Sequence, residues 1–164
     1  MISLEAFTPA DFGRLINWVD SQALLTQFAG PIFRYPLSEE QLDTYLAEPQ
    51  RRAFRVFHQQ RVIGHAEIML SEDGVAKLCR LLIGRPQDRG QGWGEQLVRT
   101  LLHLCWKRYG VNAVELNVYD GNPAAIRCYE KVGFIRQSEQ ELIAAGAFPS
   151  KRIINMRINK GREQ

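Results

Sequence analysis

Cysteine is scarce in this sequence, and the few cysteines present lack the spacing of a ligand set. The 164 residues include three cysteines, Cys79, Cys105 and Cys128, and none belongs to a C-x-x-C pair or lies near a His-rich stretch. Disulfide frameworks and sequence-adjacent metal sites both need such spacing, so we expect no metal ligand. We interpret all three cysteines as small core side chains.

Long apolar runs and a strong excess of charge are also missing. No apolar stretch approaches the roughly 20 residues that a helix needs to cross a bilayer. The residues from Met1 to Glu5 have neither the basic nor the apolar segment of a secretory signal. The formal net charge of +3 is far from the dense basic stripe of a nucleic-acid-binding protein. We therefore expect a cytoplasmic protein that binds neither membrane nor nucleic acid.

What remains is the composition of an ordinary globular protein. Hydrophobic residues make up 45% of the chain and charged residues 24%. There is no internal repeat, no low-complexity tract and no interdomain linker. A chain of this length can bury roughly 70% of its unfolded surface in one core. We predict a single domain over residues 1–164, as a monomer or a homodimer.

The spacing of apolar residues predicts strands and helices in a mixed order. Strands are expected at about residues 1–7, 53–57, 62–70, 75–84, 113–119, 134–143 and 152–158. Helices are expected at about residues 9–20, 38–48, 95–108 and 122–132, and residues 21–37 are expected to be irregular. This order indicates an α/β fold with a central mixed sheet of about seven strands, flanked by about four helices.

One loop has an unusual glycine pattern. Gly90, Gly92 and Gly94 occupy alternate positions between the predicted strand at 75–84 and the predicted helix at 95–108. A strand that turns into a helix through glycines leaves backbone N–H groups unobstructed at the helix N-terminus. There the helix dipole adds about half a positive charge. Such a turn is typical of an anion-binding site.

Three kinds of phosphate-binding loop compete for this turn. The loop of nucleoside triphosphatases needs Lys-Ser or Lys-Thr after its last glycine, whereas Glu95-Gln96 follows Gly94. A dinucleotide-binding loop needs the spacing G-x-G-x-x-G after a first strand, whereas this loop is G-x-G-x-G in mid-chain. The third kind is the diphosphate loop of an acyl-coenzyme A enzyme. Residues 89–94 fit the R/Q-x-x-G-x-G pattern of the GNAT superfamily of N-acetyltransferases, which the loop resembles.

A second signature strengthens the resemblance. In the GNAT family the corresponding region reads approximately L-x-V-x-x-x-N-x-x-A-x-x-x-Y-E-K-x-G-F. The residues that match it here are Leu116, Val118, Asn122, Ala125, Tyr129, Glu130, Lys131, Gly133 and Phe134. The resemblance covers residues 75–134 strongly and the N-terminal third only through the order of elements.

The resemblance implies a GNAT-like fold and direct acetyl transfer from acetyl-coenzyme A to a primary amine, on a small molecule or a protein N-terminus. It implies a cofactor-binding core at about 75–134 and acceptor-side elements at about 8–50 and 135–158. The implied acetyl-coenzyme A contacts are Leu82, Ile83, Gly84, Arg89, Gly90, Gln91, Gly92, Trp93, Gly94, Asn122 and Tyr129. The loop would bind the diphosphate, the strand end would pair with the pantetheine amides, and Tyr129 would protonate the thiolate as general acid.

Several residues have two interpretations. Tyr129 is a general acid or a core tyrosine with a satisfied hydroxyl. Glu67 is a candidate general base acting through water, or a solvated or ion-paired carboxylate, and His65 shares its face. Trp93 packs on the helix or covers the cofactor. Gly84 stands where the family often has a β-branched residue, and we expect it to loosen the strand end.

The acceptor site implied by the resemblance lies between residues 22–35 and 144–150. Its expected aromatic residues are Phe28, Phe33, Tyr35 and Phe148. Carboxylates that would attract a polyamine, or simply form a solvated helix face, are Glu39, Glu40, Asp43 and Glu48. The N-terminal layout loosely resembles the ribosomal-protein N-acetyltransferase branch. The alternative function is a non-catalytic acyl-coenzyme A sensor or regulatory module of the same fold.

Overall fold

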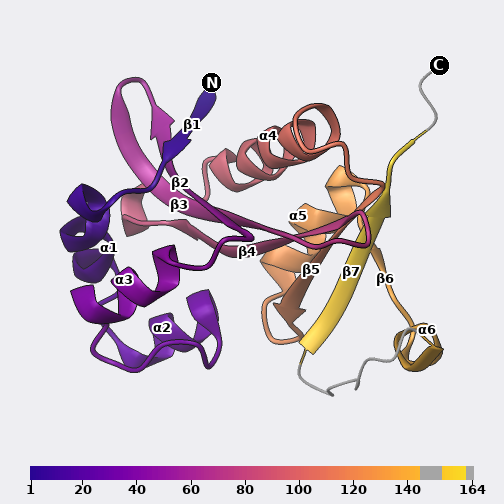
Figure 1. The fold of residues 1–164 in the computed structure, drawn as a ribbon, viewed down its shortest axis with the longest axis horizontal. Coiled ribbons are helices and arrows are strands. Elements are labelled where there is room, and N and C mark those ends of the chain that lie inside the picture. Colours follow the sequence, from indigo (N-terminus) through magenta and orange to yellow (C-terminus); the bar gives the residue numbers. More distant parts are fainter. Residues whose placement is uncertain (145–152, 162–164) are drawn as a thin grey trace.

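A seven-stranded mixed sheet runs through the computed structural model, which describes residues 1–144 and 153–161 (Figure 1). Its strands are β1 (Ile2–Ala6), β2 (Arg51–His58), β3 (Arg61–Leu70), β4 (Val75–Ile83), β5 (Ala113–Tyr119), β6 (Ile135–Arg136) and β7 (Ile153–Asn159). Their order in space is β1-β2-β3-β4-β5-β7-β6. The pairing is antiparallel throughout except between β4 and β5, which are parallel.

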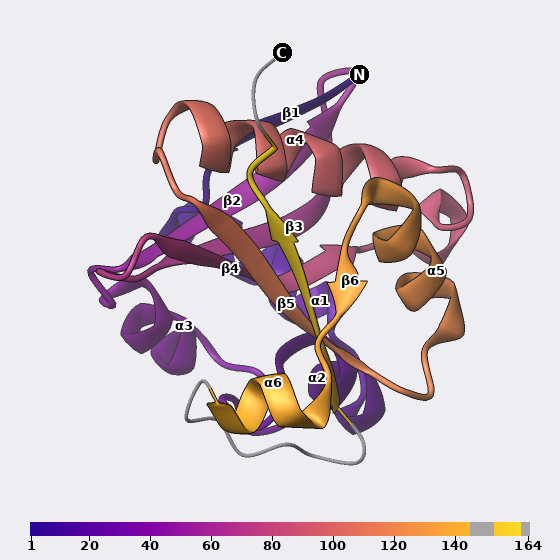
Figure 2. The same ribbon diagram turned by 90° about the vertical axis from the view of Figure 1, so that its right-hand side faces the viewer.

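Helices cover both faces of the sheet (Figures 1 and 2). The N-terminal group is α1 (Phe12–Trp18), α2 (Gln22–Ala29) and α3 (Glu39–Leu46), and the later helices are α4 (Trp93–Lys107), α5 (Pro123–Val132) and α6 (Glu139–Ala144). The apolar side chains of the first three helices join one buried cluster, and those of α4 and α5 join another on the opposite face. The middle strands are therefore buried on both sides, as their nearly continuous apolar runs require.

Local sequence explains where the helices begin and which face they bury. Ser38 caps α3 by accepting a hydrogen bond from the N–H of Gln41, and Asn122 caps α5 through the N–H of Ala125. Helix α4 buries a stripe at helical spacing, formed by Leu97, Val98, Leu101, Leu102 and Cys105. These elements agree with the expected helices at 38–48, 95–108 and 122–132.

Two expectations about secondary structure are wrong, and both concern helices. Helix α2 lies in residues 21–37, expected to be irregular, and Ser21 caps it by accepting from the N–H of Leu24 at 3.1 Å. The strand expected at 134–143 is reduced to β6, and α6 follows it with Ser138 accepting from the N–H of Glu141 at 3.1 Å. In residues 21–37, Gly and Pro residues indicated irregular structure, and in residues 134–143 the sequence pattern indicated a strand. In each segment a helix begins at a serine cap instead. The part of the chain that the structure describes thus has six α-helices instead of about four.

The two parallel strands in the middle of the sheet diverge. Strand β4 pairs with β5 only from Val75 to Leu78, opposite Ala113 to Leu116, although both strands continue. Between β3 and β4 the register shifts, so that Glu67 faces Cys79 but His65 faces Leu82. This β-bulge bends β4 away from β5 and opens the sheet at one end.

The bulge is centred on Arg80, whose φ is +48°. Regular alternation would send the side chains of Cys79 and Arg80 to opposite faces. Instead, both line the same cavity, and Arg80 reaches Glu67, the cross-strand partner of Cys79. The left-handed φ of Arg80 therefore determines which side chains of β4 line the cavity.

Candidate active site

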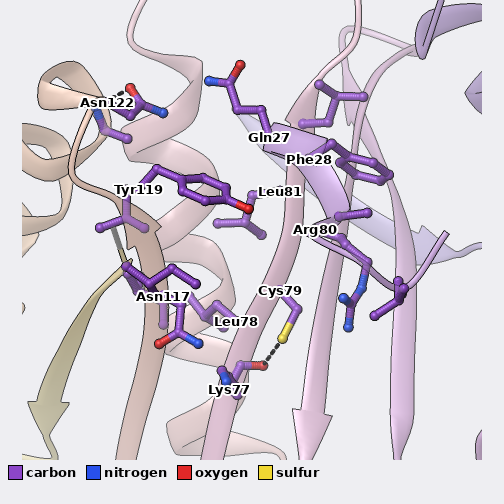
Figure 3. A pocket seen from close by; sticks show the side chains of 18 of the residues that line it. Gln27, Phe28, Lys77, Leu78, Cys79, Arg80, Leu81, Asn117, Tyr119 and Asn122 are labelled. Carbon is purple, nitrogen blue, oxygen red and sulfur yellow. Dashed lines mark hydrogen bonds between the residues drawn. The ribbon is translucent and has the colours of Figure 1, made fainter. Parts of the chain in front are cut away.

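A cavity of about 730 Å³ occupies the gap between the diverging strands. Its walls come from the C-terminal part of β4, the end of β5, helix α2 and the first turns of α5. Figure 3 shows side chains of β4, Lys77 to Leu81, and of β5, Asn117 and Tyr119, around the same hollow. A cavity of this size and mixed lining can hold a small-molecule ligand.

The glycine loop lies after the end of β4, where α4 begins. Gly90 and Gly92 have φ of +74° and +85°, and Gly92 is the N-cap of α4. None of the backbone N–H groups from 90 to 95 donates a hydrogen bond to another described residue. No atom beyond the chain neighbours lies within 4 Å of a Cβ placed on Gly90, Gly92 or Gly94. No described side chain fills the turn, and its free N–H donors lie at the N-terminus of a 15-residue helix.

The side chains of Arg89 and Gln91 donate hydrogen bonds to backbone carbonyls that precede them in the chain. Arg89 donates from Nε to the carbonyl of Ile83 at 2.9 Å and from Nη2 to that of Gly84 at 3.0 Å. Gln91 donates from Nε2 to the carbonyl of Gln87 at 2.7 Å. The Arg89 guanidinium therefore clamps the end of β4 while its charge stays beside the glycine loop.

The expectation that Gly84 loosens the strand end is wrong. Its N–H donates to the carbonyl of Ile63 at 2.9 Å, and its carbonyl accepts from Arg89. A Cβ on Gly84 would overlap the indole ring of Trp18, which packs directly on this backbone. Glycine is needed here for close packing. Leu82 and Ile83 line the cavity, whereas Gly84 does not.

Trp93 packs on the protein. Its ring centroid lies 3.9 Å from that of His58 on β2, and the side chain contacts the core cluster shared with α4. Of the two interpretations, the structure supports packing at the start of the helix.

Tyr129 and Asn122 stand together on the α5 wall of the cavity. The ring of Tyr129 packs on Phe134 with centroids 6.0 Å apart. Its hydroxyl makes no hydrogen bond with a described residue, so the alternative of a satisfied core tyrosine is not supported there. Burial raises the pKa of Tyr129 to about 12, which keeps the phenol protonated at neutral pH. Asn122 Oδ1 accepts from the N–H of Ala125 at 3.3 Å while the residue lines the cavity.

Glu67 is fully buried and ion-paired. Arg80 donates to both of its oxygens, at 2.7 Å to Oε2, Arg51 Nε lies 3.2 Å from Oε2, and the Tyr45 hydroxyl donates to Oε1. Burial acts to raise the pKa of Glu67, but the hydrogen bond and charge of Arg80 outweigh it, so the pKa is lowered. Glu67 does not line the cavity, and Arg80 stands between them. This geometry supports the ion-pair interpretation of Glu67.

His65 belongs to the same buried cluster. Its Nε2 lies 3.1 Å from the Tyr45 hydroxyl, and its side chain is 1% exposed. Burial lowers the pKa of His65 to about 4. The charge of Glu67 acts to raise this pKa, and the charge of Arg80 acts to lower it. The imidazole is therefore neutral at physiological pH.

Sequence reasoning missed Tyr45, Arg51 and Arg80. Arg80 did have a signal, because it is a single cation inside the apolar run from Leu78 to Leu82. A charge that interrupts a buried strand needs a partner, and Glu67 on the neighbouring strand supplies it.

Only one of the described aromatic residues expected at the acceptor site lines the cavity. Phe28 lines the cavity, Phe33 is buried in the α1–α3 cluster, and Tyr35 donates its hydroxyl to the carbonyl of Asp20 at 2.9 Å. Phe148 lies outside the described residues. Of the α3-side acids, Glu39, Glu40 and Asp43 are exposed and away from the cavity. Glu48 lines a second hollow of about 580 Å³, with Tyr45 and Arg51.

The described residues form neither a metal centre nor a membrane-spanning helix. Within residues 1–144 and 153–161, no three His, Cys, Asp or Glu side chains cluster closely enough to hold a metal ion. None of the helices described there is long and apolar enough to pass through a membrane.

The diverging strands, the bulge and the unplugged glycine turn define an acyl-coenzyme A N-acyltransferase fold. The model of the acetyltransferase (GNAT) family matches residues 22–134, and the chain belongs to this family. It is an acetyl-coenzyme A-dependent N-acetyltransferase of amines. Membership of this family is consistent with the acyl-coenzyme A kind among the three phosphate loops.

Several known proteins are similar to this chain. The aminoglycoside N(6')-acetyltransferase type 1 of Klebsiella pneumoniae is 27% identical over 151 residues, which cover 83% of this chain and 75% of that protein. An uncharacterized N-acetyltransferase of Mycobacterium bovis is 30% identical over 98 residues, covering 60% and 62%.

Solved structures show the same fold at lower identity. The aminoglycoside acetyltransferase AAC(6')-Ib in complex with coenzyme A and kanamycin superimposes with a TM-score of 0.75 at 21% identity, covering 98% of this chain and 95% of that one. The spermidine N-acetyltransferase of Vibrio cholerae with coenzyme A and spermine gives 0.75 at 21% identity, covering 96% and 95%. Both confirm the predicted fold.

Proposed function

We propose that acetyl-coenzyme A lies in the gap between β4 and β5, with its diphosphate on the turn from Gly90 to Gly94 and its thioester beside Tyr129. The observation that carries this proposal is the divergence of the two strands after Leu78 and Leu116. It leaves one cavity that has free backbone donors near one end and an unbonded phenol on its wall.

The pantetheine arm would lie along β4 as an added strand. From Cys79 to Ile83 this edge of β4 has no partner strand on the β5 side. An extended amide-containing chain can satisfy such an edge with main-chain hydrogen bonds. The carbonyls of Ile83 and Gly84 already accept from Arg89, so the earlier part of the edge would contribute most of these bonds. Asn122 would contact the arm from the opposite wall.

The reaction is direct transfer. The neutral amine attacks the thioester carbonyl carbon, a C–N bond forms, the C–S bond breaks, and the amine nitrogen gives its extra proton to water. Tyr129 donates its proton to the departing thiolate, as general acid, and the resulting phenolate takes a proton back from solvent. N–H groups of the bulged strand beside the carbonyl would stabilise the oxyanion of the tetrahedral intermediate.

Glu67 would act through Arg80 instead of serving as a base. It is fully buried behind Arg80, and both of its oxygens already accept hydrogen bonds. By holding Arg80 it would fix the backbone of the bulge, and with it the donors that face the thioester. Glu67 is in this sense a positioning residue.

The relatives suggest two classes of acceptor to test first. The similar proteins include an aminoglycoside acetyltransferase and a spermidine acetyltransferase. Their acceptors are polyamines in the chemical sense, because each carries several amino groups. Aminoglycosides and spermidine therefore belong in any acceptor panel.

The test is coenzyme A binding followed by turnover. Isothermal titration should show acetyl-coenzyme A and coenzyme A binding, and hydrogen exchange should show protection of the amides from 90 to 95 on binding. Matched titrations with ATP and NAD should show neither effect. Thiol release with an amine panel then separates a transferase from a sensor. Binding without turnover on any amine would favour the sensor, and protection confined to another part of the chain would refute the placement.

A further inference from the structure

Among the described residues that line the cavity, every charged side chain is a cation. Its lining includes the cations Lys77, Arg80 and Arg89, and no Asp or Glu is among the described residues that line it. The charge on the described walls of the cavity is therefore of one sign.

Two of these cations are distant from the diphosphate loop. Lys77 precedes Ile83 by six residues, a distance of up to about 20 Å at roughly 3.3 Å per residue along a strand. Arg80 lies at the bulge between them, and its guanidinium is held by Glu67 on β3. Arg89 serves the loop end and already donates to two carbonyls. The charges of Lys77 and Arg80 are thus available to a ligand other than coenzyme A.

Neither charge is fully neutralised by the protein. Glu67 is shared by Arg80 and Arg51, so this buried cluster has two guanidinium groups for one carboxylate. Arg80 Nη1 makes no hydrogen bond with a described residue, and the side chain is 12% exposed. Lys77 has no ion pair within the described residues, because its neighbour on β5, Glu115, pairs with Arg157 at 2.8 Å.

We propose that the acceptor is a primary amine that also carries an anionic group, a carboxylate or a phosphate, which Arg80 and Lys77 bind. An acceptor with several ammonium groups would bring like charges together in a partly desolvated cavity, which is unfavourable. An anionic group would complete the pairing of the two-to-one cluster and orient the amine toward the thioester beside the bulge. This proposal rests on the proposed function, since it assumes that the amine enters this cavity.

The test is a panel of matched amines with acetyl-coenzyme A and the full-length chain. Each pair differs only in the anion: phenylalanine and phenethylamine, lysine and cadaverine, phosphoethanolamine and ethanolamine, with spermidine and kanamycin alongside. We expect kcat/KM to be at least about tenfold higher for the anionic member of one pair, as one desolvated charge pair can provide. The amino acid and phosphate arms distinguish the two sources of the anion.

Two variants locate the effect. Lys77→Glu should reduce the preference for the anionic amine about tenfold and raise activity on its neutral counterpart, in line with reversal of one charge. Lys160→Glu, at an exposed lysine beyond β7, is the matched control and should change neither value. If Lys77→Glu lowers the melting temperature, Lys77→Met replaces it.

Each other outcome overturns the proposal in a recognisable way. Faster acetylation of spermidine or kanamycin, equal rates within every pair, or no turnover of any amine despite acetyl-coenzyme A binding would each refute the anionic acceptor. Failure to bind acetyl-coenzyme A would refute the proposed function, and this proposal with it.

Discussion

Arg80 and Glu67 form a two-point ion pair across β3 and β4, with the guanidinium donating from Nε and Nη2, the latter at 2.7 Å, to the two carboxylate oxygens. Arg80 has a left-handed φ of +48°, which is unfavourable for a residue with a side chain by roughly 1–2 kcal/mol. The pair holds the Arg80 side chain against β3 at the residue where the register of β3 and β4 shifts. A buried charge therefore lies at the point where β4 leaves β5.

Removing the charge of Glu67 should destabilise the protein strongly. In Glu67→Gln two guanidinium groups stay partly buried with no anion, so the free energy of unfolding should fall by about 3–5 kcal/mol. Urea unfolding measures this change. Glu5→Gln is the control, because Glu5 pairs with Arg55 at 2.7 Å at the surface and its side chain is 55% exposed. A change of about 1 kcal/mol or less is expected there, and equal effects at the two sites would contradict this account.

Stability should decrease as pH falls from 6.5 to about 4, because of His65. Its pKa is lowered from 6.5 to about 4 by burial, so in this range the unfolded chain binds a proton that the native state does not. The full effect corresponds to about 3 kcal/mol at 1.36 kcal/mol per pH unit. His65→Gln should remove this slope whatever its effect on stability at pH 8, whereas His103→Gln, at an exposed site on α4, should keep it. Urea unfolding at a series of pH values tests both variants.

Tyr129→Phe should slow transfer without weakening cofactor binding. The variant keeps the ring packed on Phe134 and removes only the proton donor, so kcat should fall by about 10²–10⁴-fold if the phenol is the general acid. The Kd of acetyl-coenzyme A from isothermal titration should stay within about twofold, in line with loss of a group that acts only in the transition state. Tyr109→Phe, near the end of α4, is the control. An unchanged kcat would assign Tyr129 to packing alone.

Gly92 and Gly94 should respond differently to alanine. Gly92 has a φ of +85°, so Gly92→Ala should reduce the free energy of unfolding by roughly 1–2 kcal/mol. Gly94 lies in the first turn of α4 with open space around it, so Gly94→Ala should be neutral or stabilising. Gly92→Glu should in addition weaken acetyl-coenzyme A binding, because it puts a carboxylate at the proposed diphosphate site. If Gly92→Glu binds acetyl-coenzyme A as tightly as the unchanged protein, the proposed diphosphate site on the glycine turn is refuted.

Gly84 and Trp18 should be coupled. Gly84→Ala places a Cβ against the indole ring and should destabilise by about 1–3 kcal/mol. In a Trp18→Leu background the same substitution should cost much less, which a double-mutant cycle measures. Gly13→Ala, with nothing within 4 Å, controls for glycine replacement in an N-terminal helix. Additive effects of Gly84→Ala and Trp18→Leu would show that the two residues do not share one packing contact.

Much of the cofactor side could be predicted from local pattern. The strands at 62–70, 75–84 and 113–119 and the helices at 95–108 and 122–132 were predicted almost to the residue, because apolar periodicity and caps act over one or two turns. The glycine loop was singled out by its local pattern, and the role of Tyr129 was inferred from the family resemblance. Helices α2 and α6 were missed, because both are short and the serine caps at Ser21 and Ser138 were not given enough weight.

Local sequence was enough to predict most of the strands, the helices at 95–108 and 122–132, the family and the glycine turn, since each follows from residues close together in the chain. The partners of the charged side chains, by contrast, follow from the tertiary fold alone. Whether Glu67 faces a ligand or Arg80, and whether Gly84 loosens a strand or receives Trp18, depends on segments brought together from distant parts of the chain. The bulge at Arg80 makes this difference largest, because one residue with a left-handed φ reverses the alternation from which side-chain direction is inferred.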